Sequence, residues 1–158
     1  MSAGSATFLA ALLHIEENLM KIKLLESGTL PTKATSGAAC YDVYARQDLW
    51  ISPGHTALVP LGFSIQLPED RAALILPRSG MAYKHRVTVL NAPGVIDSDY
   101  RGEVMALLMN HGDTSHTITV GERVAQMMIT SLTSAVFEVV TQLDETTRAG
   151  GGFGSTGR

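Results

Sequence analysis

Prolines and glycines divide this chain into short segments, and that division restricts the folds open to it. All six prolines lie between residues 31 and 93. Apolar runs of strand length follow one another along the chain, at residues 55–59, 63–67, 72–76, 86–90, 103–110, 116–120, 123–130 and 137–140. Many of these runs are β-branched, and no stretch after Met20 has a helical period of useful length. Short strands bounded by turns predict an all-β fold, a distorted β-barrel or a jelly-roll-like sandwich.

Size and composition exclude several classes of protein. A chain of 158 residues suits one domain that buries most of its apolar surface. Its net charge of −3 lacks the basic excess typical of duplex-binding proteins, so we expect no nucleic-acid partner. The single cysteine, Cys40, allows no internal disulfide and is typical of a reducing compartment. The histidines form no HExxH motif, so no zinc-type cluster is indicated.

The N-terminal residues 5–20 carry apolar side chains at helical spacing, which indicates an amphipathic helix. The segment has no basic start, and Glu16 and Glu17 interrupt its apolar run. It therefore fits neither a signal peptide nor a membrane span, and we expect a cytoplasmic protein without a membrane partner. We expect residues 1–19 to be an extension with a possible short helix, and Met20 to begin the folded domain.

Two apolar runs, VMALLM at 104–109 and VAQMM at 124–128, are too apolar for strands with one solvent-facing side. We expect both sides of these strands to be buried, in part against other copies of the chain. The pattern therefore predicts a homo-oligomer.

Polar and glycine-rich segments separate the strands and carry groups suited to phosphate chemistry. In PRSGMA, Arg78 can bind phosphate oxygens while Ser79 adds a hydroxyl, although the same segment also fits a surface turn with a solvated arginine. In GERVAQM, Arg123 and Gln126 begin a strand, where a salt bridge at the rim explains them equally well. Asp42 lies in an apolar strand, so its charge is either paired with a cation or a turn, or it reaches a site.

The segment 91–104, NAPGVIDSDYRGEV, places Asp97 directly after the apolar pair Val95 and Ile96. Its Pro-Gly turn and alternating residues indicate a hairpin. A carboxylate in that position can take a proton from a water or can cap the turn. Tyr100 offers a flat wall for a sugar or a base, or packs within the hairpin.

The C-terminal residues 148–158, RAGGGFGSTGR, contain five glycines and cannot easily hold a helix or a strand. A tail of this composition is typical of a disordered terminus. Its arginines, aromatic ring and hydroxyl groups also suit contacts with an anion and a flat ring.

Five segments of the chain, taken in order, resemble the five motifs of the trimeric deoxyuridine triphosphate nucleotidohydrolases, the dUTPases: ATSGAACYDVYA, PRSGMA, NAPGVIDSDYRG, GERVAQM and RAGGGFGSTG. The resemblance spans about Ile22 to Gly157. It implies a homotrimer of jelly-roll-like β-barrels, in which each active site combines more than one chain. It also implies hydrolysis of dUTP to dUMP and pyrophosphate, which keeps uracil out of DNA and supplies dUMP for thymidylate synthesis. The barrel domain then covers residues 20–147, and residues 148–158 form a mobile lid.

The same resemblance implies a role for each motif residue. Asp97 would be the general base that deprotonates the water attacking the α-phosphorus, and Tyr100 would pack under the deoxyribose. Mg²⁺ would be coordinated by triphosphate oxygens without a direct protein ligand, and Asp42 would contact the ion through water. The other implied contacts are with uracil at Asn91, Val95, Ile96 and Met105, with phosphates at Arg78, Ser79, Gly80 and Gln126, and from the lid at Arg148, Phe153, Gly154, Ser155 and Thr156.

Two positions depart from the family pattern, and two other functions stay open. Cys40 stands where glycine is usual and Met81 where leucine or serine is commoner, but neither change removes a functional group. A dCTP deaminase shares the fold, but it would need a catalytic glutamate in the pocket and usually lacks the complete GGFGSTG tail. A binding module would keep the nucleotide pocket and act by engaging a regulatory protein.

Overall fold

The computed structural model describes residues 19–152, and strands dominate this part of the chain. The first half contains β1 (Lys21–Leu24), β2 (Tyr41–Tyr44), β3 (Leu49–Ile51), β4 (Thr56–Pro60), β5 (Phe63–Gln66) and β6 (Arg71–Leu76). The helix α2 (Ser79–His85) follows, and then β7 (Val87–Val89), β8 (Gly94–Ile96), β9 (Met105–Asn110), β10 (His116–Ile118) and β11 (Arg123–Ser131). These elements confirm the prediction of an all-β fold.

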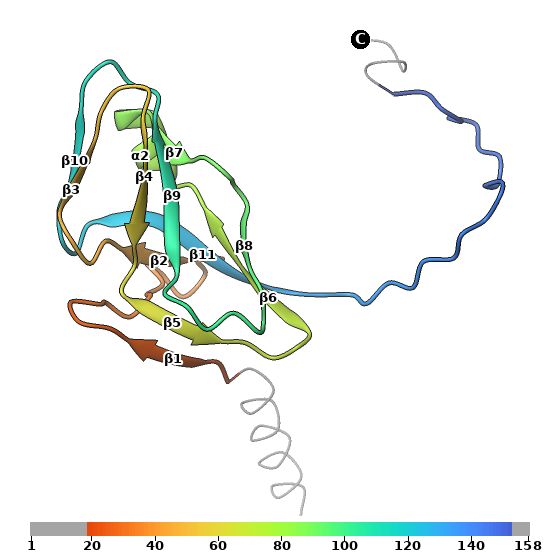
Figure 1. Cartoon of the computed structure of the whole chain (residues 1–158), viewed down its shortest axis with the longest axis horizontal. Helices are drawn as coiled ribbons and strands as arrows, with labels where there is room; N and C mark the ends of the chain where they lie inside the picture. Colours follow the sequence, from red (N-terminus) through yellow and green to blue (C-terminus); the bar gives the residue numbers. More distant parts are fainter. Residues whose placement is uncertain (1–18, 153–158) are drawn as a thin grey trace, which may run out of the picture.

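The strands form several small antiparallel sheets rather than one large sheet. The largest has the order β2-β11-β6-β8, and a three-stranded sheet has the order β4-β9-β7. Two ribbons of two strands each, β1 with β5 and β10 with β3, complete this part of the chain. Figure 1 shows the sheets wrapped around a common centre. Because most neighbouring strands are distant in sequence, the chain must cross between sheets, as it does in jelly-roll-like folds.

The core lies between these sheets and takes side chains from most of the strands. Its largest fully buried apolar side chains include Phe63, Ile51, Leu61, Ile75 and Leu108. Burying one such side chain contributes roughly 1.5–3 kcal/mol to folding. Along β9, buried positions alternate with exposed or half-buried ones. Residues 19–152 of a single chain therefore bury one face of β9 fully and leave the other face exposed or half-buried.

The helix α2 differs from the sequence-based expectation, which assigned residues 77–82 to a turn and found no helix after Met20. The helix has only seven residues, and Met81 is its buried residue. A segment this short has too few apolar positions to give a helical period. It ends at Arg86, whose φ of 55° is left-handed and whose N–H donates to the carbonyl of Ala82 at 3.1 Å.

Residues 137–140 are not a strand, although their composition predicted one. They belong to the segment 132–152, which leaves the barrel after β11 and contains no strand. Figure 1 shows this segment in blue, running away from the sheets. Val136 and Phe137 are 99% and 92% exposed. A strand needs a partner for its N–H and C=O groups, and the part of the chain that is described offers none to this segment.

Gly28 and Gly62 touch each other where the β1–β5 ribbon joins the rest of the barrel. Gly62 has a φ of +73°, a conformation that glycine adopts without a steric penalty. The two backbones approach so closely that a side-chain carbon on either residue would collide with the backbone of the other. The N–H of Leu25 donates to the carbonyl of Gly62 at 2.9 Å, which ties the turn after β1 to this contact.

No helix within residues 19–152 is long and apolar enough to cross a membrane. The amphipathic helix expected over residues 5–20 lies almost entirely outside the described residues. Of that segment the structure describes Leu19 and Met20, which directly precede β1.

Candidate active site

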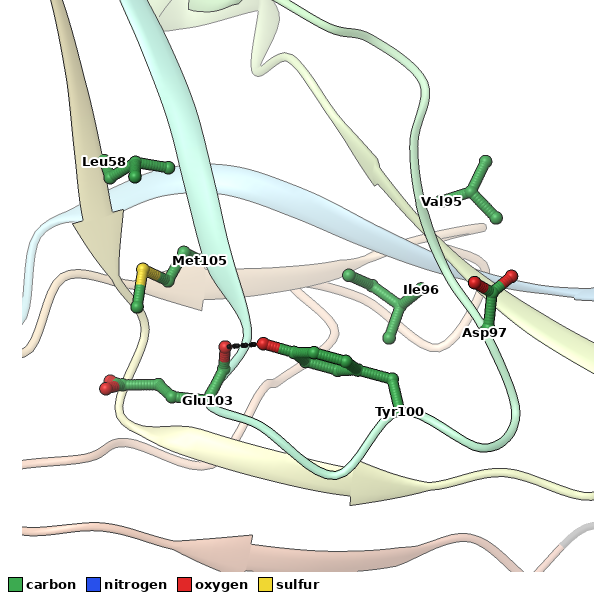
Figure 2. Close-up of a pocket in the computed structure, with 7 residues that line it drawn as sticks. All are labelled: Leu58, Val95, Ile96, Asp97, Tyr100, Glu103 and Met105. Carbon is green, nitrogen blue, oxygen red and sulfur yellow. Dashed lines mark hydrogen bonds between the residues drawn. The ribbon is translucent and has the colours of Figure 1, made fainter.

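A cleft beside the loop between β7 and β9 contains the residue predicted as the general base. β7 and β9 pair with each other, and the loop that joins them carries β8 across to pair with β6. The cleft has a volume of about 270 Å³. We name it the apolar cleft, and its lining residues are Leu58, Val95, Ile96, Asp97, Tyr100, Glu103 and Met105. Figure 2 shows how these side chains lie around it.

Asp97 and Tyr100 are held in place by the loop that carries them. Asp97 directly follows β8 and is exposed. Its carbonyl accepts the N–H of Tyr100 at 3.2 Å, and the Tyr100 hydroxyl donates to the carbonyl of Glu103 at 3.0 Å, as Figure 2 shows for the second bond. Because the turn is bonded at both ends, the carboxylate and the aromatic ring keep a defined position relative to each other.

Glu103 fastens the end of this loop to the barrel. Its carboxylate accepts Nε and Nη2 of Arg46 at 2.5 and 2.9 Å and the N–H of Gly62 at 2.9 Å. The hydrogen bond from Arg46 is the main reason that the pKa of Glu103 lies below its ordinary value of 4.5, and the Gly62 N–H adds to the effect. A two-pronged arginine–carboxylate contact is among the stronger polar interactions in proteins, so it anchors one wall of the apolar cleft.

A second cleft lies beside α2 and has a different chemical character. We name it the basic cleft; its volume is about 560 Å³. Its lining residues are Tyr44, Arg78, Gly80, Met81, Lys84, His85, Gly121, Glu122 and Arg123. The cations of Arg78, Lys84 and Arg123 outnumber the single carboxylate of Glu122, so the cleft favours anions.

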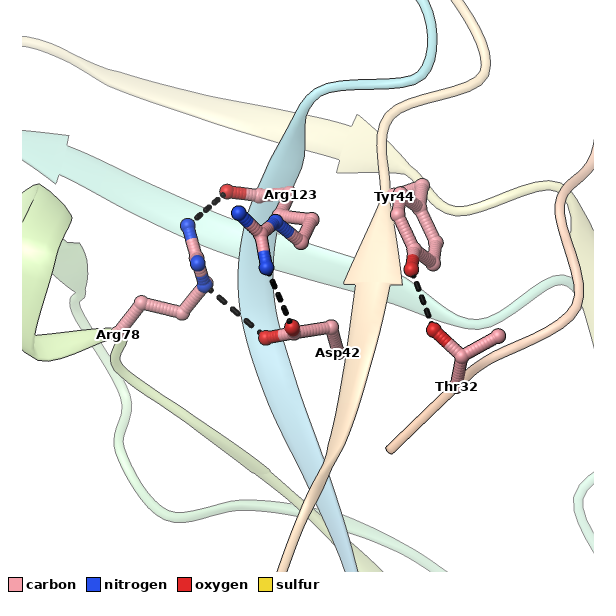
Figure 3. A network of polar contacts seen from close by, with 5 residues as sticks. All are labelled: Thr32, Asp42, Tyr44, Arg78 and Arg123. Carbon is pink, nitrogen blue, oxygen red and sulfur yellow. Dashed lines mark hydrogen bonds and ion pairs between the residues drawn. The ribbon is translucent and has the colours of Figure 1, made fainter. Parts of the chain in front are cut away.

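Arg78 directly precedes α2 and reaches Asp42 on β2. Its Nε donates to one carboxylate oxygen of Asp42 at 3.1 Å, and its Nη1 donates to the carbonyl of Arg123 at 2.9 Å. The Nη1 of Arg123 donates to the other oxygen of Asp42, also at 3.1 Å. Figure 3 shows the three residues joined in this way. The sequence left open whether Asp42 is paired with a cation, and the structure pairs it with two.

The two clefts share no lining residue, and parts of them lie at opposite edges of the largest sheet. In the order β2-β11-β6-β8, Asp42 lies on one edge strand and Ile96 on the other. Three strand spacings separate these edges, which is about 14 Å at the usual spacing. The register adds a further offset along β6, where Leu76 is in the row of Asp42 and Ala73 is opposite Ile96. One chain therefore presents the predicted site residues in two separate places.

Comparison with known proteins shows what the chain is related to. A family model described as dUTPase matches residues 26–157. The deoxyuridine 5'-triphosphate nucleotidohydrolase of Gloeothece citriformis is 47% identical over 135 residues, which cover 85% of this chain and 93% of that protein. The enzyme of the same name from Rhizobium rhizogenes is 46% identical over 144 residues, covering 89% and 92%. The chain belongs to the dUTPase family.

Solved dUTPase structures share its architecture. The dUTPase of Staphylococcus bacteriophage 80alpha, described with dUPNHPP, superposes with a TM-score of 0.83 at 23% identity, covering 89% of this chain and 99% of that one. The dUTPase of phage phi11 of S. aureus superposes with a TM-score of 0.75 at 18% identity, covering 82% and 100%. Likeness at this identity concerns the fold, and it confirms the jelly-roll-like β fold that was predicted.

The motif residues of this dUTPase-family chain gather in two groups. Those of the third motif that line the apolar cleft are Val95, Ile96, Asp97 and Tyr100, and Met105 joins them from just beyond the motif. Those of the second motif that line the basic cleft are Arg78, Gly80 and Met81. Ser79 is exposed at the start of α2, between Arg78 and Gly80. Gln126 is half-buried on β11, directly opposite Asp42 on β2.

Other predicted positions lie apart from both clefts or outside the described residues. Asn91 does not line the apolar cleft, and its side-chain amide lies close to Gly94. Arg148 is exposed in the segment 132–152, where its Nε donates to the carbonyl of Gly151 at 3.0 Å. The remaining lid positions fall outside residues 19–152, and they are Phe153, Gly154, Ser155 and Thr156.

Several lining residues of the two clefts escaped the sequence-based prediction. Leu58 is 62% exposed on β4, and one leucine in an apolar strand carries no signal that sets it apart. Glu103 follows the third motif directly, but its partner Arg46 lies 57 positions away, so no local pattern joins them. Lys84 could have been found from Gly80, because residues four apart share one face of a helix, had α2 been recognised.

Proposed function

We propose that this chain hydrolyses dUTP to dUMP and pyrophosphate, by attack of a water on the α-phosphorus with Asp97 as the general base. Membership of the dUTPase family supports the reaction, and the chain is an enzyme on that ground. The position of Asp97 carries the mechanism: it is an exposed carboxylate beside the apolar cleft, on a turn fixed by the N–H of Tyr100. Solvent can therefore deliver a water to a carboxylate whose backbone is held by a hydrogen bond. The reaction would keep uracil out of DNA and supply dUMP for thymidylate synthesis.

The apolar cleft would hold the uracil and the deoxyribose. Val95 and Met105 contribute exposed apolar side chains beside the ring of Tyr100. Tyr100 would pack under the sugar, and the backbone near Ile96 would read the edge of the base together with Asn91. A narrow site of this kind disfavours a 5-methyl group by steric overlap and cytosine by its different donor pattern.

The basic cleft would hold the phosphates. Arg78 would supply charge and several N–H donors, Ser79 and Gly80 would add contacts from the start of α2, and Gln126 would add an amide. Charged donors held in place before the substrate arrives lower the barrier, because they stabilise the charge that shifts toward the leaving pyrophosphate.

Mg²⁺ is the expected cofactor. The cations that line the basic cleft favour the phosphates of the nucleotide, and phosphate oxygens are donors that Mg²⁺ prefers. When bound, the ion would neutralise phosphate charge. We expect the triphosphate to carry it without a direct protein ligand, with contact from Asp42 through water.

The separation of the two clefts supports an active site shared between copies of the chain. Asp97 of one copy would face Arg78 of another in a homotrimer, and the lid of residues 148–158 would close over the nucleotide. The exposed apolar side chains of the segment 132–152 support burial of this segment against another copy. We assign residues 20–147 to the dUTPase-like domain, of which residues 132–147 leave the barrel after β11, and residues 1–19 to an extension.

We further propose that the reaction takes place in the cytoplasm, without a nucleic-acid or membrane partner. The free Cys40 supports a reducing compartment. The net charge of −3 is unfavourable for a nucleic-acid partner.

One assay tests the reaction and its alternatives. The purified chain is incubated with Mg²⁺ and each deoxynucleoside triphosphate in turn, and pyrophosphate and ammonia are measured. Pyrophosphate from dUTP alone is the expected result. Release of ammonia from dCTP would indicate a deaminase. If no substrate gave pyrophosphate or ammonia, a binding module would be favoured.

Two variants test the assigned roles. Asp97→Asn should lose turnover by about 10²–10⁴-fold while it still binds dUTP, since the amide keeps the shape of the side chain but cannot accept a proton. Asp99→Asn, two residues away in the same loop, is the matched control. Deletion of residues 148–158 should cut turnover severely without changing the melting temperature, and unchanged turnover would contradict the lid.

A further inference from the structure

A third pocket lies beside the basic cleft, between the end of α2 and the loop that joins β9 to β10. We name it the polar pocket, and its volume is about 350 Å³. Lys84 and His85 line both the polar pocket and the basic cleft. The proposed function gives the polar pocket no task. Its lining residues that do not line the basic cleft include Arg86, Asp113, Ser115 and His116.

A buried side chain holds the loop that forms one wall of the polar pocket. Asn110 is fully buried, and its Nδ2 donates to the carbonyl of Thr114 while its Oδ1 accepts the N–H of Gly112, both at 2.8 Å. The N–H of His111 donates to the carbonyl of Arg86 at 2.8 Å, which fastens the same loop to the end of α2. A ligand would therefore meet a wall that is already in place, and little conformational freedom would be lost on binding.

Several donors of the polar pocket have no partner within residues 19–152. The backbone N–H groups of Asp113, Thr114 and Ser115 donate to no acceptor in that part of the chain, and all three residues line the pocket. The side chains of Lys84 and Arg86 form no ion pair there either. Successive unpaired N–H groups in a turn make a concave site for an anion, and nearby cations add to its attraction.

His116 independently points to a ligand of negative charge. Its side chain is 12% exposed and lines the polar pocket, and its Nε2 is buried without a hydrogen-bond partner among residues 19–152. Oε1 of Glu122 is 3.9 Å from this nitrogen, which is too far for a hydrogen bond. Burial, and next the charge of His85, lower the pKa of His116, so the ring is neutral at neutral pH. An anion in the pocket would favour the protonated ring, whose Nε2–H is attracted to Glu122.

We propose that the polar pocket is a second anion site, which binds a small oxyanion of the phosphate class between Arg86, Lys84 and the loop of residues 112–115. Among the lining residues, the cations of Lys84 and Arg86 outnumber the single carboxylate of Asp113. The inference goes beyond the proposed function, which assigns the phosphates of the nucleotide to the basic cleft. Because Lys84 lines both places, an oxyanion in the polar pocket would share this side chain with the nucleotide.

The test measures anion binding while the proposed nucleotide site is filled. The full-length protein is saturated with Mg²⁺ and the dUTP analogue dUPNHPP, and inorganic phosphate and pyrophosphate are then titrated separately by calorimetry. We expect inorganic phosphate to bind. Binding of pyrophosphate alone would assign the pocket to the larger member of the same class, and binding of neither anion would overturn the proposal.

One substitution should weaken this binding. Arg86→Gln removes a cation that lines the polar pocket and not the basic cleft, so affinity for the anion should fall about fivefold or more. Arg71→Gln is the matched control, because Arg71 pairs with Asp70 and lines neither place. It should keep the affinity within about twofold of the wild type.

A second substitution should act in the opposite direction. Asp113→Asn removes the carboxylate that repels an anion, so affinity should rise about two- to fivefold, which a poorly folded variant would not produce. Unchanged anion binding in a folded Arg86→Gln variant, or in Asp113→Asn, would contradict the proposal. A wild-type chain that binds phosphate but not dUPNHPP would refute the proposed function and leave the second anion site standing.

Discussion

The apolar cleft and the basic cleft are both built around a carboxylate paired with arginine, and they use the pair in opposite ways. In the apolar cleft, Glu103 accepts hydrogen bonds from the guanidinium of Arg46 and from the backbone N–H of Gly62, and so ties the end of the loop to the barrel. In the basic cleft, Asp42 holds side chains, the guanidinium groups of Arg78 and Arg123. The pair of Glu103 and Arg46 fixes a wall of the apolar cleft, while Asp42 orients two positive charges that line the basic cleft. Substitution at Glu103 should therefore act first on stability, and substitution at Asp42 first on anion binding.

The largest expected effect comes from dividing the clefts between two chains. Asp97→Asn and Arg78→Ala should each lose about 10²-fold or more of turnover when assembled alone. Co-refolded in equal amounts, they should recover about a quarter of the wild-type sites, because a shared site then draws Asp97 from one variant and Arg78 from the other. Pyrophosphate release measures the recovery. A chain that carries both substitutions, refolded alone, is the control, and no recovery in the mixture would contradict a shared site.

A smaller effect is expected from removing the charge that anchors the apolar cleft. Glu103→Gln leaves Arg46 without its counter-charge, so the free energy of unfolding should fall by about 1–3 kcal/mol. Urea unfolding measures the change. The exposed pair of Asp70 and Arg71 offers the comparison, since Asp70→Asn should change stability by less than about 0.5 kcal/mol. A Glu103→Gln variant as stable as Asp70→Asn would refute the anchoring role.

The same anchor should weaken in acid. The pKa of Glu103 is lowered in the folded chain from 4.5, mainly by the hydrogen bond from Arg46. The folded state therefore binds the proton less readily than the unfolded state, and the stabilisation is complete above 4.5 and lost as the pH falls through the lowered value. The difference in unfolding free energy between wild type and Glu103→Gln should shrink over that range. A difference that stays constant down to strongly acidic pH would show that ionisation is not its source.

The smallest effect concerns His116, beside the basic cleft. Burial, and next the charge of His85 with ring centres 4.7 Å apart, lower the pKa of His116 below 6.5, while Glu122 opposes the shift. Folding therefore disfavours the protonated ring, so stability should fall slightly as the pH drops from 6.5 toward the lowered value, and then level off. His116→Gln should flatten this slope in thermal melts. The same change at the exposed His55 is the control, and an unaltered slope in His116→Gln would contradict the prediction.

Local patterns were sufficient to predict most strands and the residues of the loop between β7 and β9. Asp97 and Tyr100 stood out because a carboxylate and a ring follow an apolar pair within a few residues. Residues 137–140 show where such patterns end: their composition suits a strand, but a strand forms only where a second strand is available. Whether a segment has a partner is decided by the whole assembly rather than by its own residues.

Contacts between distant residues were beyond prediction for the same kind of reason. The charge of Asp42 required a partner, yet nothing in the sequence chose between Arg78, Arg123 and a nearby turn. The hydrogen bond from Arg46 to Glu103 depends on the tertiary fold, because the two residues are 57 positions apart in the sequence. No short-range spacing predicts it. The helix α2 is an intermediate case, too short for a period but long enough to bring Lys84 to the cleft.

The touching backbones of Gly28 and Gly62 set a limit on how this sequence can diverge. Neither position has room for a methyl group. The positive φ of Gly62 is a second, independent reason why most other residues are disfavoured at that position. A saturation library at either position should return glycine almost exclusively, whatever the selection, while a library at the open Gly37 should tolerate many residues. The N–H of Gly62 also donates to Glu103, so the position of this glycine backbone also affects a lining residue of the apolar cleft. These two glycines are therefore positions of the barrel at which we expect almost no sequence variation.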